Sequence, residues 1–208
     1  TCALPICLSV LNSPAVSIVG TRNPSVSGFK TTFNFSKELT TLGYTVVSGL
    51  ALGIDTAAHK GTILSGKTIA VLACGLDNIY PTANKKLAVE IIKNGGCLIS
   101  EYSPGEPPLK WRFIQRNRII SGLSEATVVM ESPPKSGALI TADFALEQNR
   151  DLYFHESALS VQERYNIIAQ KKGLSEKVQK LRCVQRYIDE GAPCISSVKD
   201  LVTSLFIK

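Results

Sequence analysis

Three loops in the sequence combine small residues with cations, a pattern typical of sites that bind phosphate groups. In the first loop, the apolar run at residues 16–19 leads into Gly20, Thr21 and Arg22, and a helical pattern follows from residue 28. Backbone amides at a helix start, small residues that allow close approach and a guanidinium fork all suit a phosphate. A glycine turn that serves only packing explains the same residues equally well, so both interpretations stay open for this loop taken alone.

The second loop runs into a segment in which cations are interleaved with aromatic residues. Four cations and two aromatic residues fall within nine positions: Lys110, Trp111, Arg112, Phe113, Arg116 and Arg118. Cations can follow the phosphates of a nucleic acid while an aromatic ring stacks on an unpaired base, so this composition indicates single-stranded nucleic acid. The alternative is a surface helix with Trp111 and Ile114 in the core and solvated cations.

The third loop precedes the helical pattern at residues 138–148. Lys135, Ser136 and the amides around Gly137 make a second helix start that suits a phosphate. The loop lacks the glycine that a Walker A motif places before its Gly-Lys-Ser/Thr ending, and no carboxylate cluster is arranged for magnesium, which disfavours ATP hydrolysis. The first loop lacks the G-x-G-x-x-G spacing, which disfavours ordinary NAD binding.

A fourth loop contains residues that could be catalytic. Ser48 and Gly49 open it, Asp55 stands where a helix N-cap is expected, and His59 follows one turn later. A catalytic Asp/His pair needs a nucleophile, and no serine or cysteine occurs in a matching context. Capping and packing explain Asp55 and His59 better, so we predict no catalytic residue.

The elements that must position these loops follow a repeated rhythm. Short apolar runs rich in Val and Ile alternate with amphipathic helical patterns. The runs are residues 16–19, 44–47, 68–73, 97–100, 126–130 and 151–154; the helical patterns are 28–42, 54–64, 84–93, 112–121 and 138–148. Runs without polar alternation predict parallel strands covered on both faces. We therefore expect a doubly wound, mainly parallel α/β sheet with helices on both faces. The loops at the carboxyl ends then share one edge, which favours binding of nucleic acid by residues 110–118.

The remainder of the chain fits this rhythm less well. Residues 157–180 are polar and basic with a helical pattern that we cannot assign to the sheet, and residues 184–206 predict a helix, a short extended piece and another helix. We expect a single domain over residues 1–208. The chain begins with Thr, from which we infer a fragment that lacks its amino-terminal part.

The composition excludes several classes of protein. Lys and Arg outnumber Asp and Glu by 23 to 17, a net charge of +6 that permits a polyanionic partner. The six cysteines form no C-x-x-C pair and only two histidines are present, so we predict reduced thiols, no metal and no cofactor. No apolar stretch approaches the roughly eighteen residues of a membrane span, and the apolar start has no basic leader, so a cytoplasmic location is expected.

A set of motifs, in order, resembles the DprA/Smf family (DNA-processing protein A). The matching segments are residues 16–22 (VSIVGTR) with Ser25 and Gly28, 48–55 (SGLALGID) with Ala58 and His59, 75–81 (GLDNIYP), 99–101 (ISE), Phe113 with 116–124 (RNRIISGLS), and Glu131 with 135–142 (KSGALITA). They span about residues 15–150 in the spacing of the family.

The resemblance implies an extended Rossmann-like domain that holds single-stranded DNA in a basic pocket without cutting it. Such proteins protect incoming DNA in natural transformation, load the RecA recombinase and form homodimers. The phosphate-binding loop would be Gly20, Thr21 and Arg22; Lys110 and Arg116 would be cationic contacts, and Phe113 a stacking contact. The full set that we predict to bind DNA is Gly20, Thr21, Arg22, Ser48, Gly49, Lys110, Phe113, Arg116, Asn117, Arg118, Lys135, Ser136 and Gly137.

The sequence departs from the family after its sixth predicted strand. The family's Ala-Val-Pro-Gly-like turn is replaced by Phe-His-Glu-Ser-Ala at residues 154–158, and residues 155–182 form a divergent segment that affects the expected dimer and RecA contacts. Resemblance returns at residues 187–192. An alternative is a Rossmann-like nucleotide-processing enzyme of the phosphoribohydrolase kind, although the P-G-G-x-G-T loop of those enzymes is absent. A third possibility is a scaffold that has kept only the fold.

Overall fold

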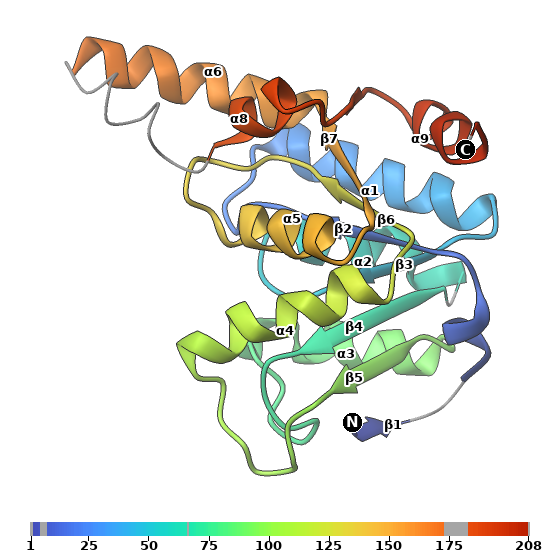
Figure 1. Ribbon diagram of the computed structural model, residues 1–208. Helices are drawn as coiled ribbons and strands as arrows, with labels where there is room; N and C mark the ends of the chain where they lie inside the picture. The colour runs from blue at the N-terminus through green and yellow to red at the C-terminus, as the bar shows by residue number, and fades with distance from the viewer. Residues whose placement is uncertain (1, 5–7, 66, 173–182, 208) are drawn as a thin grey trace.

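The computed structural model describes residues 2–4, 8–65, 67–172 and 183–207, and it has one β-sheet flanked by helices (Figure 1). The strands are β1 (Cys2–Leu4), β2 (Ala15–Val19), β3 (Thr45–Ser48), β4 (Thr68–Leu72), β5 (Cys97–Ser100), β6 (Ala126–Val129), β7 (Asp151–His155) and β8 (Cys194–Ile195). The α-helices are α1 (Val26–Thr41), α2 (Ile54–Thr62), α3 (Lys85–Lys93), α4 (Lys110–Gly122), α5 (Gly137–Glu147), α6 (Glu156–Lys171), α8 (Val184–Asp189) and α9 (Val198–Phe206). Short 3₁₀ helices cover Leu8–Asn12, Ile63–Ser65 and Thr82–Asn84.

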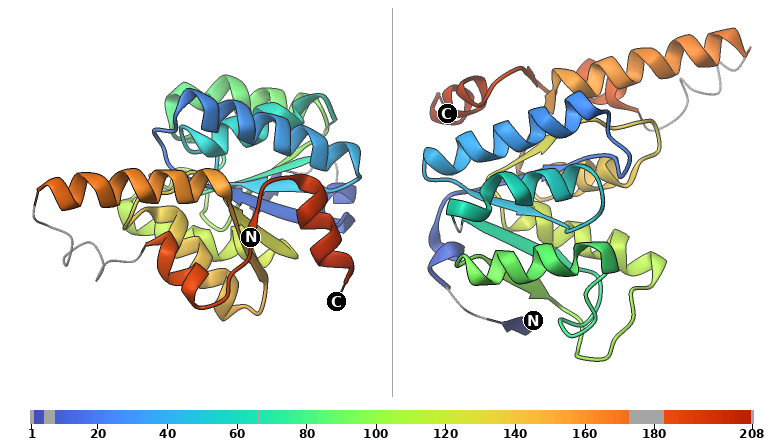
Figure 2. Two further views of the ribbon diagram at one scale, coloured as in Figure 1. Left: turned by 90° about the horizontal axis from the view of Figure 1, so that it is seen from above. Right: turned by 180° about the vertical axis from the view of Figure 1, so that it is seen from behind.

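The helices cover both faces of the sheet, as the sequence predicts. In the view from above, α1, α2 and α3 lie on one side of the strands while α4, α5 and α8 lie on the other (Figure 2, left). Helices α1 and α2 pack against each other on the first face, and α4 and α5 pack against each other on the second. The doubly wound arrangement is thereby confirmed.

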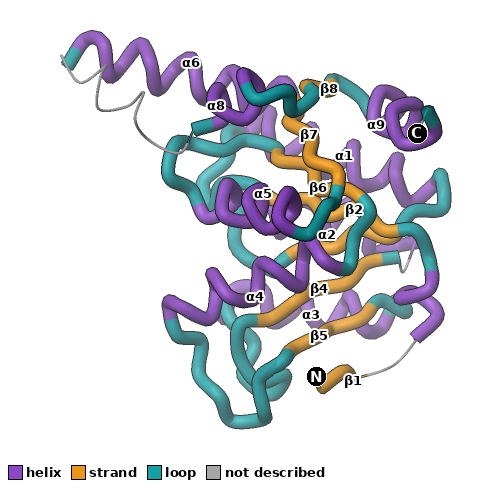
Figure 3. Tube along the Cα trace, in the orientation of Figure 1, coloured by secondary structure: helices purple, strands orange, loops and turns teal. Residues whose placement is uncertain are grey.

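The strand order within the described residues is β1-β5-β4-β3-β2-β6-β7-β8. All neighbouring pairs are parallel except β1 and β5, which are antiparallel. Figure 3 shows the strands side by side, with β1 at one margin and β8 at the other. The six predicted strands are all present. The margin strand β8 corresponds to the short extended piece expected within residues 184–206, whereas β1 is an addition, because three residues are too few to produce an apolar run that predicts a strand.

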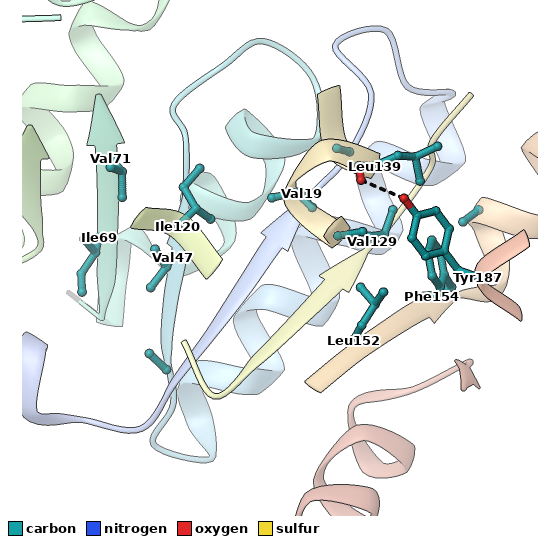
Figure 4. Packing of buried hydrophobic residues seen from close by; sticks show 14 of the residues in the cluster. Val19, Val47, Ile69, Val71, Ile120, Val129, Leu139, Leu152, Phe154 and Tyr187 are labelled. Atoms are coloured by element: carbon teal, nitrogen blue, oxygen red, sulfur yellow. Dashed lines mark hydrogen bonds between the residues drawn. The ribbon is translucent and has the colours of Figure 1, made fainter. Parts of the chain in front are cut away.

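The central strand β2 shows why these sequences form buried strands. Val16 and Ile18 pack into a cluster on the side of α1, whereas Ala15 and Val19 pack on the side of α4 and α5. Side chains at alternate positions point to opposite faces, so a strand covered on both faces must be apolar throughout. The second cluster extends to Leu139, Phe154 and Tyr187, whose ring lies beside α5 (Figure 4).

The winding of the chain reverses at β2. From β2 the chain moves through β3 and β4 to β5 on one side, and it then returns through α4 to β6 on the other side of β2. The segments after β2 and β6 therefore lead to helices on opposite faces and leave a crevice between the carboxyl ends of the two strands. This switch point is the expected place for a ligand.

The carboxyl-terminal part matches the expected helix, extended piece and helix in α8, β8 and α9. Helix α6 occupies the first part of the basic segment, and His155 caps it by accepting a hydrogen bond from the Ser157 amide (3.1 Å). The rest of that predicted helix, residues 173–180, lies outside the described residues. Among the helices that the structure describes, none is long and apolar enough to cross a membrane.

Candidate nucleic-acid interface

A cavity of about 700 Å³ opens at the carboxyl edge of the sheet, next to the switch point. Its walls come from the loops after β2 and β3, from Tyr80 in the loop after β4, and from the first turns of α4 and α5. Nine of the thirteen residues predicted to bind DNA line it: Gly20, Thr21, Arg22, Lys110, Phe113, Arg116, Asn117, Ser136 and Gly137. Helices α4 and α5 begin at the same edge and run side by side, which brings their first residues together (Figure 1).

The backbone of the loop after β2 is held on both sides. The Thr21 amide donates to the Glu131 carbonyl (2.7 Å), and the Thr21 carbonyl accepts from the Ile54 amide (3.1 Å). Gly20 is required by close approach, because a Cβ atom there would lie 2.5 Å from Cγ1 of Ile54. These contacts fix the loop so that the exposed side chain of Arg22 stands at the entrance of the cavity.

The start of α1, where we expected amides for a phosphate, already has a side-chain carboxylate beside its cap residue. Ser25 caps the helix by accepting from the Gly28 amide (2.9 Å), and the Glu131 carboxylate accepts from the Ser25 amide (2.7 Å) and the Ser25 hydroxyl. Glu131 is only 3% exposed, and a Cβ atom at Gly28 would lie 2.3 Å from its carboxylate carbon. A protein carboxylate therefore occupies the anion position at this helix start.

The Arg22 side chain, which lines the cavity, contacts an aromatic ring there. Its guanidinium carbon lies 5.5 Å from the centre of the Phe113 ring, in a cation–π contact. The Tyr80 ring meets Phe113 edge-on at 5.6 Å, and Tyr80 is 44% exposed. Sequence reasoning did not select Tyr80, although its strand ends at the same edge and residues 75–81 matched the family. The three side chains form one group, the Arg22–Phe113–Tyr80 cluster, in which Arg22 and Tyr80 are exposed and Phe113 is half-buried.

The start of α5 differs from the start of α1. Ser136 is the N-cap residue, but its hydroxyl lies 2.6 Å from the Ser132 hydroxyl and does not cap the helix. Lys135 adopts a left-handed backbone conformation (φ 63°), and its side chain is exposed beside the cavity rather than on its wall. Asn117 donates to the Gly137 carbonyl (3.2 Å), which joins α4 to this turn. The first turn of α5 thus faces the cavity without a cap from its own N-cap side chain.

Arg116 is placed differently from the exposed cation that we predicted. It is only 4% exposed, at the floor of the cavity, and donates to the carbonyls of Gly49 (2.7 Å) and Val71. Its Nε donates to Oδ1 of Asn117 (3.2 Å). Burial lowers the pKa of Arg116 to about 10, so the guanidinium remains charged at neutral pH. Arg116 ties α4 to β4 and to the loop after β3 through its Nη1, while its Nε is used within α4.

Two further predicted residues lie behind the cavity. The Ser48 hydroxyl is fully buried and donates to the Ile18 carbonyl (2.7 Å). Gly49 leaves space for Arg116, because a Cβ atom there would lie 2.5 Å from the guanidinium. Both residues support the floor rather than the wall. Arg118 lies outside the cavity and forms an ion pair with Glu101.

Asp55 and His59 both serve the interior. Gly53, not Asp55, is the N-cap of α2, and the Asp55 carboxylate accepts from the amides of Gly49 (3.2 Å) and Ala51 (3.3 Å). Burial raises the pKa of Asp55, and the Arg116 charge opposes this shift. His59 bonds through Nδ1 to the Thr68 hydroxyl (2.8 Å), and burial lowers its pKa to about 3, so the ring is neutral. The two side chains have separate structural partners.

The fold and this crevice define a class: a Rossmann-like α/β protein whose cationic and aromatic residues converge at the switch point of its sheet. The model of the family described as DNA recombination-mediator protein A matches residues 7–206. The chain therefore belongs to the DNA recombination-mediator protein A family, which confirms the resemblance to DprA/Smf proteins.

Individual relatives agree with this assignment. Protein Smf of Synechocystis is 49% identical over 156 residues, which cover 74% of this chain and 39% of that protein. DNA processing protein DprA of Streptococcus pneumoniae is 40% identical over 196 residues, which cover 94% of this chain and 63% of that protein. The chain thus spans less than two thirds of the length of each of these two relatives.

Solved structures confirm the fold. DprA of Streptococcus pneumoniae superposes with a TM-score of 0.77 at 37% identity, covering 95% of this chain and 63% of that one. DprA of Helicobacter pylori, whose structure is described for its single-stranded DNA binding mode, gives 0.78 at 29% identity, covering 98% and 85%. The molybdenum cofactor carrier protein of Chlamydomonas reinhardtii gives 0.58 at 16% identity and shares the fold alone.

Proposed function

We propose that this chain binds single-stranded DNA in the crevice at the carboxyl edge of its sheet. The observation that carries the proposal is the Arg22–Phe113–Tyr80 cluster at the entrance of a cavity of about 700 Å³. An exposed guanidinium beside two aromatic rings suits a phosphate next to an unpaired base. The relative from Helicobacter pylori, described by its binding of single-stranded DNA, supports the same ligand class.

The crevice residues divide into those that contact DNA and those that support them. Arg22, Lys110 and Lys135 are exposed cations for phosphates, and Phe113 with Tyr80 receives a base. The first turn of α5, with Ser136 and Gly137, holds a further phosphate through its amides and positive dipole. The supporting residues are Arg116, Asn117 and Asp55 at the cavity, with Ser48 and Gly49 behind them. Arg118, which is paired with Glu101 outside the cavity, is assigned no contact there.

We infer that the interaction is binding without chemistry. Asp55 and His59, the acid and base nearest to the crevice floor, are both engaged by internal partners. A phosphoribohydrolase-like activity on nucleotides is the alternative, and release of free base from a nucleoside monophosphate by the purified chain would support it instead.

The wider role follows from the family. We propose that the chain acts as one DNA-binding unit in the cytoplasm, protects incoming single-stranded DNA during natural transformation and cooperates with a RecA-type recombinase as a homodimer. Membership of a recombination-mediator family supports the recombinase and the DNA ligand. Light scattering of the purified chain tests the dimer, and pull-down with purified RecA tests the recombinase contact.

Comparison of single- and double-stranded DNA of equal length tests the proposal. Fluorescence anisotropy of labelled oligo-dT, titrated with the chain at several salt concentrations, should show binding that weakens as salt rises, because phosphate contacts release counterions. The duplex should bind more weakly, since its bases cannot reach Phe113. Equal affinity for both, or no binding at low salt, would refute the proposed function.

A further inference from the structure

We propose that Trp111 is a second stacking platform, which holds a base outside the cavity on the outer side of α4. The inference rests on the proposed function, because it assigns the path of the same DNA strand beyond the crevice. Trp111 takes no part in the Arg22–Phe113–Tyr80 cluster and does not line the cavity. It is nevertheless 54% exposed, an unusual position for the largest apolar side chain in proteins.

The Trp111 ring is braced by two neighbouring side chains. It meets the buried Tyr102 ring edge-on at 6.4 Å, and the Arg112 guanidinium lies 5.2 Å from its centre. Arg112 is itself fixed, because it donates to the Pro107 carbonyl (3.0 Å) and pairs with Glu106. A ring that is already held by its neighbours loses little conformational freedom when a base stacks on it.

The position of Trp111 on α4 relates it to the crevice. Lys110, the first residue of α4, is exposed and lines the cavity, and Trp111 follows it directly. Phe113 lies two positions further along, so it points to a different side of the helix. A strand that passes over the beginning of α4 can place one base on Phe113 and another on Trp111, with Lys110 near the phosphate between them.

Charge and location favour a nucleic acid as the occupant. Lys110, which directly precedes Trp111, places an exposed cation beside the start of this path, whereas Arg118, seven residues after Trp111, is already paired with Glu101. Helix α4 begins at the outer margin of the molecule, where a strand leaving the crevice has open space (Figure 1). Lys110 lines the cavity and directly precedes Trp111, so the ring lies next to the proposed DNA path. A site for an unrelated ligand would not need to lie there.

The single tryptophan of the chain makes this inference directly measurable. Titration with oligo-dT of about 20 nucleotides, enough to extend past one binding site, should quench the Trp111 emission as the complex forms. Trp111→Ala should weaken binding by about five- to tenfold, the lower part of the range for loss of one base–aromatic stack, and Trp111→Phe should stay within about twofold of the parent. Circular dichroism verifies that each variant is folded.

Leu64→Ala provides the matched control. Leu64 is 95% exposed and lies in the 3₁₀ helix before β4, at the opposite edge of the sheet, so its loss should leave binding unchanged. If the parent binds oligo-dT but Trp111→Ala binds equally well and the emission does not change, the platform is refuted while the crevice stands. If the parent does not bind oligo-dT, the proposed function fails and the inference fails with it.

Discussion

Helices α1 and α5 begin on either side of the switch point, and each begins after a loop of small residues with a cation. Their surroundings differ, because a carboxylate lies at the start of α1 and the cavity lies at the start of α5. At α1, the Ser25 hydroxyl accepts from the Gly28 amide and the Glu131 carboxylate accepts from the Ser25 amide and hydroxyl, so a carboxylate of the protein already lies at this helix start. At α5, the Ser136 hydroxyl turns to Ser132 and the first turn faces the cavity. A loop of small residues before a helix therefore does not by itself make an anion site. Whether a phosphate can bind at such a helix start depends on which residues from other parts of the chain lie opposite it.

The largest expected effect tests the occupied start. Glu131→Ala leaves the Ser25 amide and hydroxyl without their buried acceptor, and we expect the free energy of unfolding to fall by about 2–4 kcal/mol. Ser136→Ala removes only one hydroxyl pair at the other start and should cost at most about 1 kcal/mol. Urea denaturation followed by circular dichroism measures both values. If both variants lost a similar free energy of unfolding, the start of α1 would not be held by its acceptor more firmly than the start of α5, and the contrast would be wrong.

A smaller effect tests how the loop before α1 contributes to binding. With its helix start occupied, this loop offers the Arg22 side chain, so Arg22→Ala should weaken oligo-dT binding by about tenfold, the range of a charge-assisted contact beside an aromatic ring. Arg118→Ala is the matched control, because Arg118 is paired with Glu101 outside the cavity. Anisotropy titrations measure the affinity of both variants for oligo-dT. If both variants lost affinity equally, Arg22 would not be a DNA contact of the crevice.

The smallest effect concerns the lysine at the open start. Lys135→Ala should lower affinity for oligo-dT about threefold and reduce the slope of log affinity against log salt by about 0.7, the value for one phosphate contact on a single strand. Lys30→Ala, an exposed lysine on α1, should leave the slope unchanged. A salt series for each variant gives the slopes. Loss of slope at Lys30 rather than Lys135 would move the DNA path to α1.

The central strands and the helices between them can be predicted from the sequence, because local patterns of apolar residues determine them. Runs such as residues 16–19 and 126–130 are apolar on both faces, which specifies strands in the middle of a covered sheet. The order of strands and helices then brings Arg22, Lys110 and Phe113 to one edge, as expected. The antiparallel strand β1 escapes prediction because three residues give no periodicity.

The details of the crevice depend on contacts between distant parts of the chain, which local patterns do not contain. Glu131 holds Ser25, the N-cap residue of α1, although it is 106 positions away in the sequence. The residues of the first loop give no sign of this contact. Arg116 has the same side chain as its neighbour Arg118, yet one is buried and the other is exposed. Helical position alone does not reveal this, because the carbonyls that receive Arg116 come from β4 and the loop after β3.

A pair of proline variants tests the central claim most directly, namely that the phosphate-binding helix start is α5 and not α1. Proline is tolerated at the first position of a helix and removes only its amide hydrogen. Gly137 and Val26 occupy that position in α5 and α1, follow extended residues, and have room for a ring, since a Cβ atom at Gly137 meets nothing within 4 Å and Val26 is 90% exposed.

The measurement is the affinity of Gly137→Pro and Val26→Pro for oligo-dT, with unfolding curves showing that both variants are as stable as the parent. We predict that Gly137→Pro binds about fivefold more weakly, the effect of losing one hydrogen bond worth about 1 kcal/mol, and that Val26→Pro binds like the parent. A loss confined to Val26→Pro, or no loss in Gly137→Pro, would contradict the account.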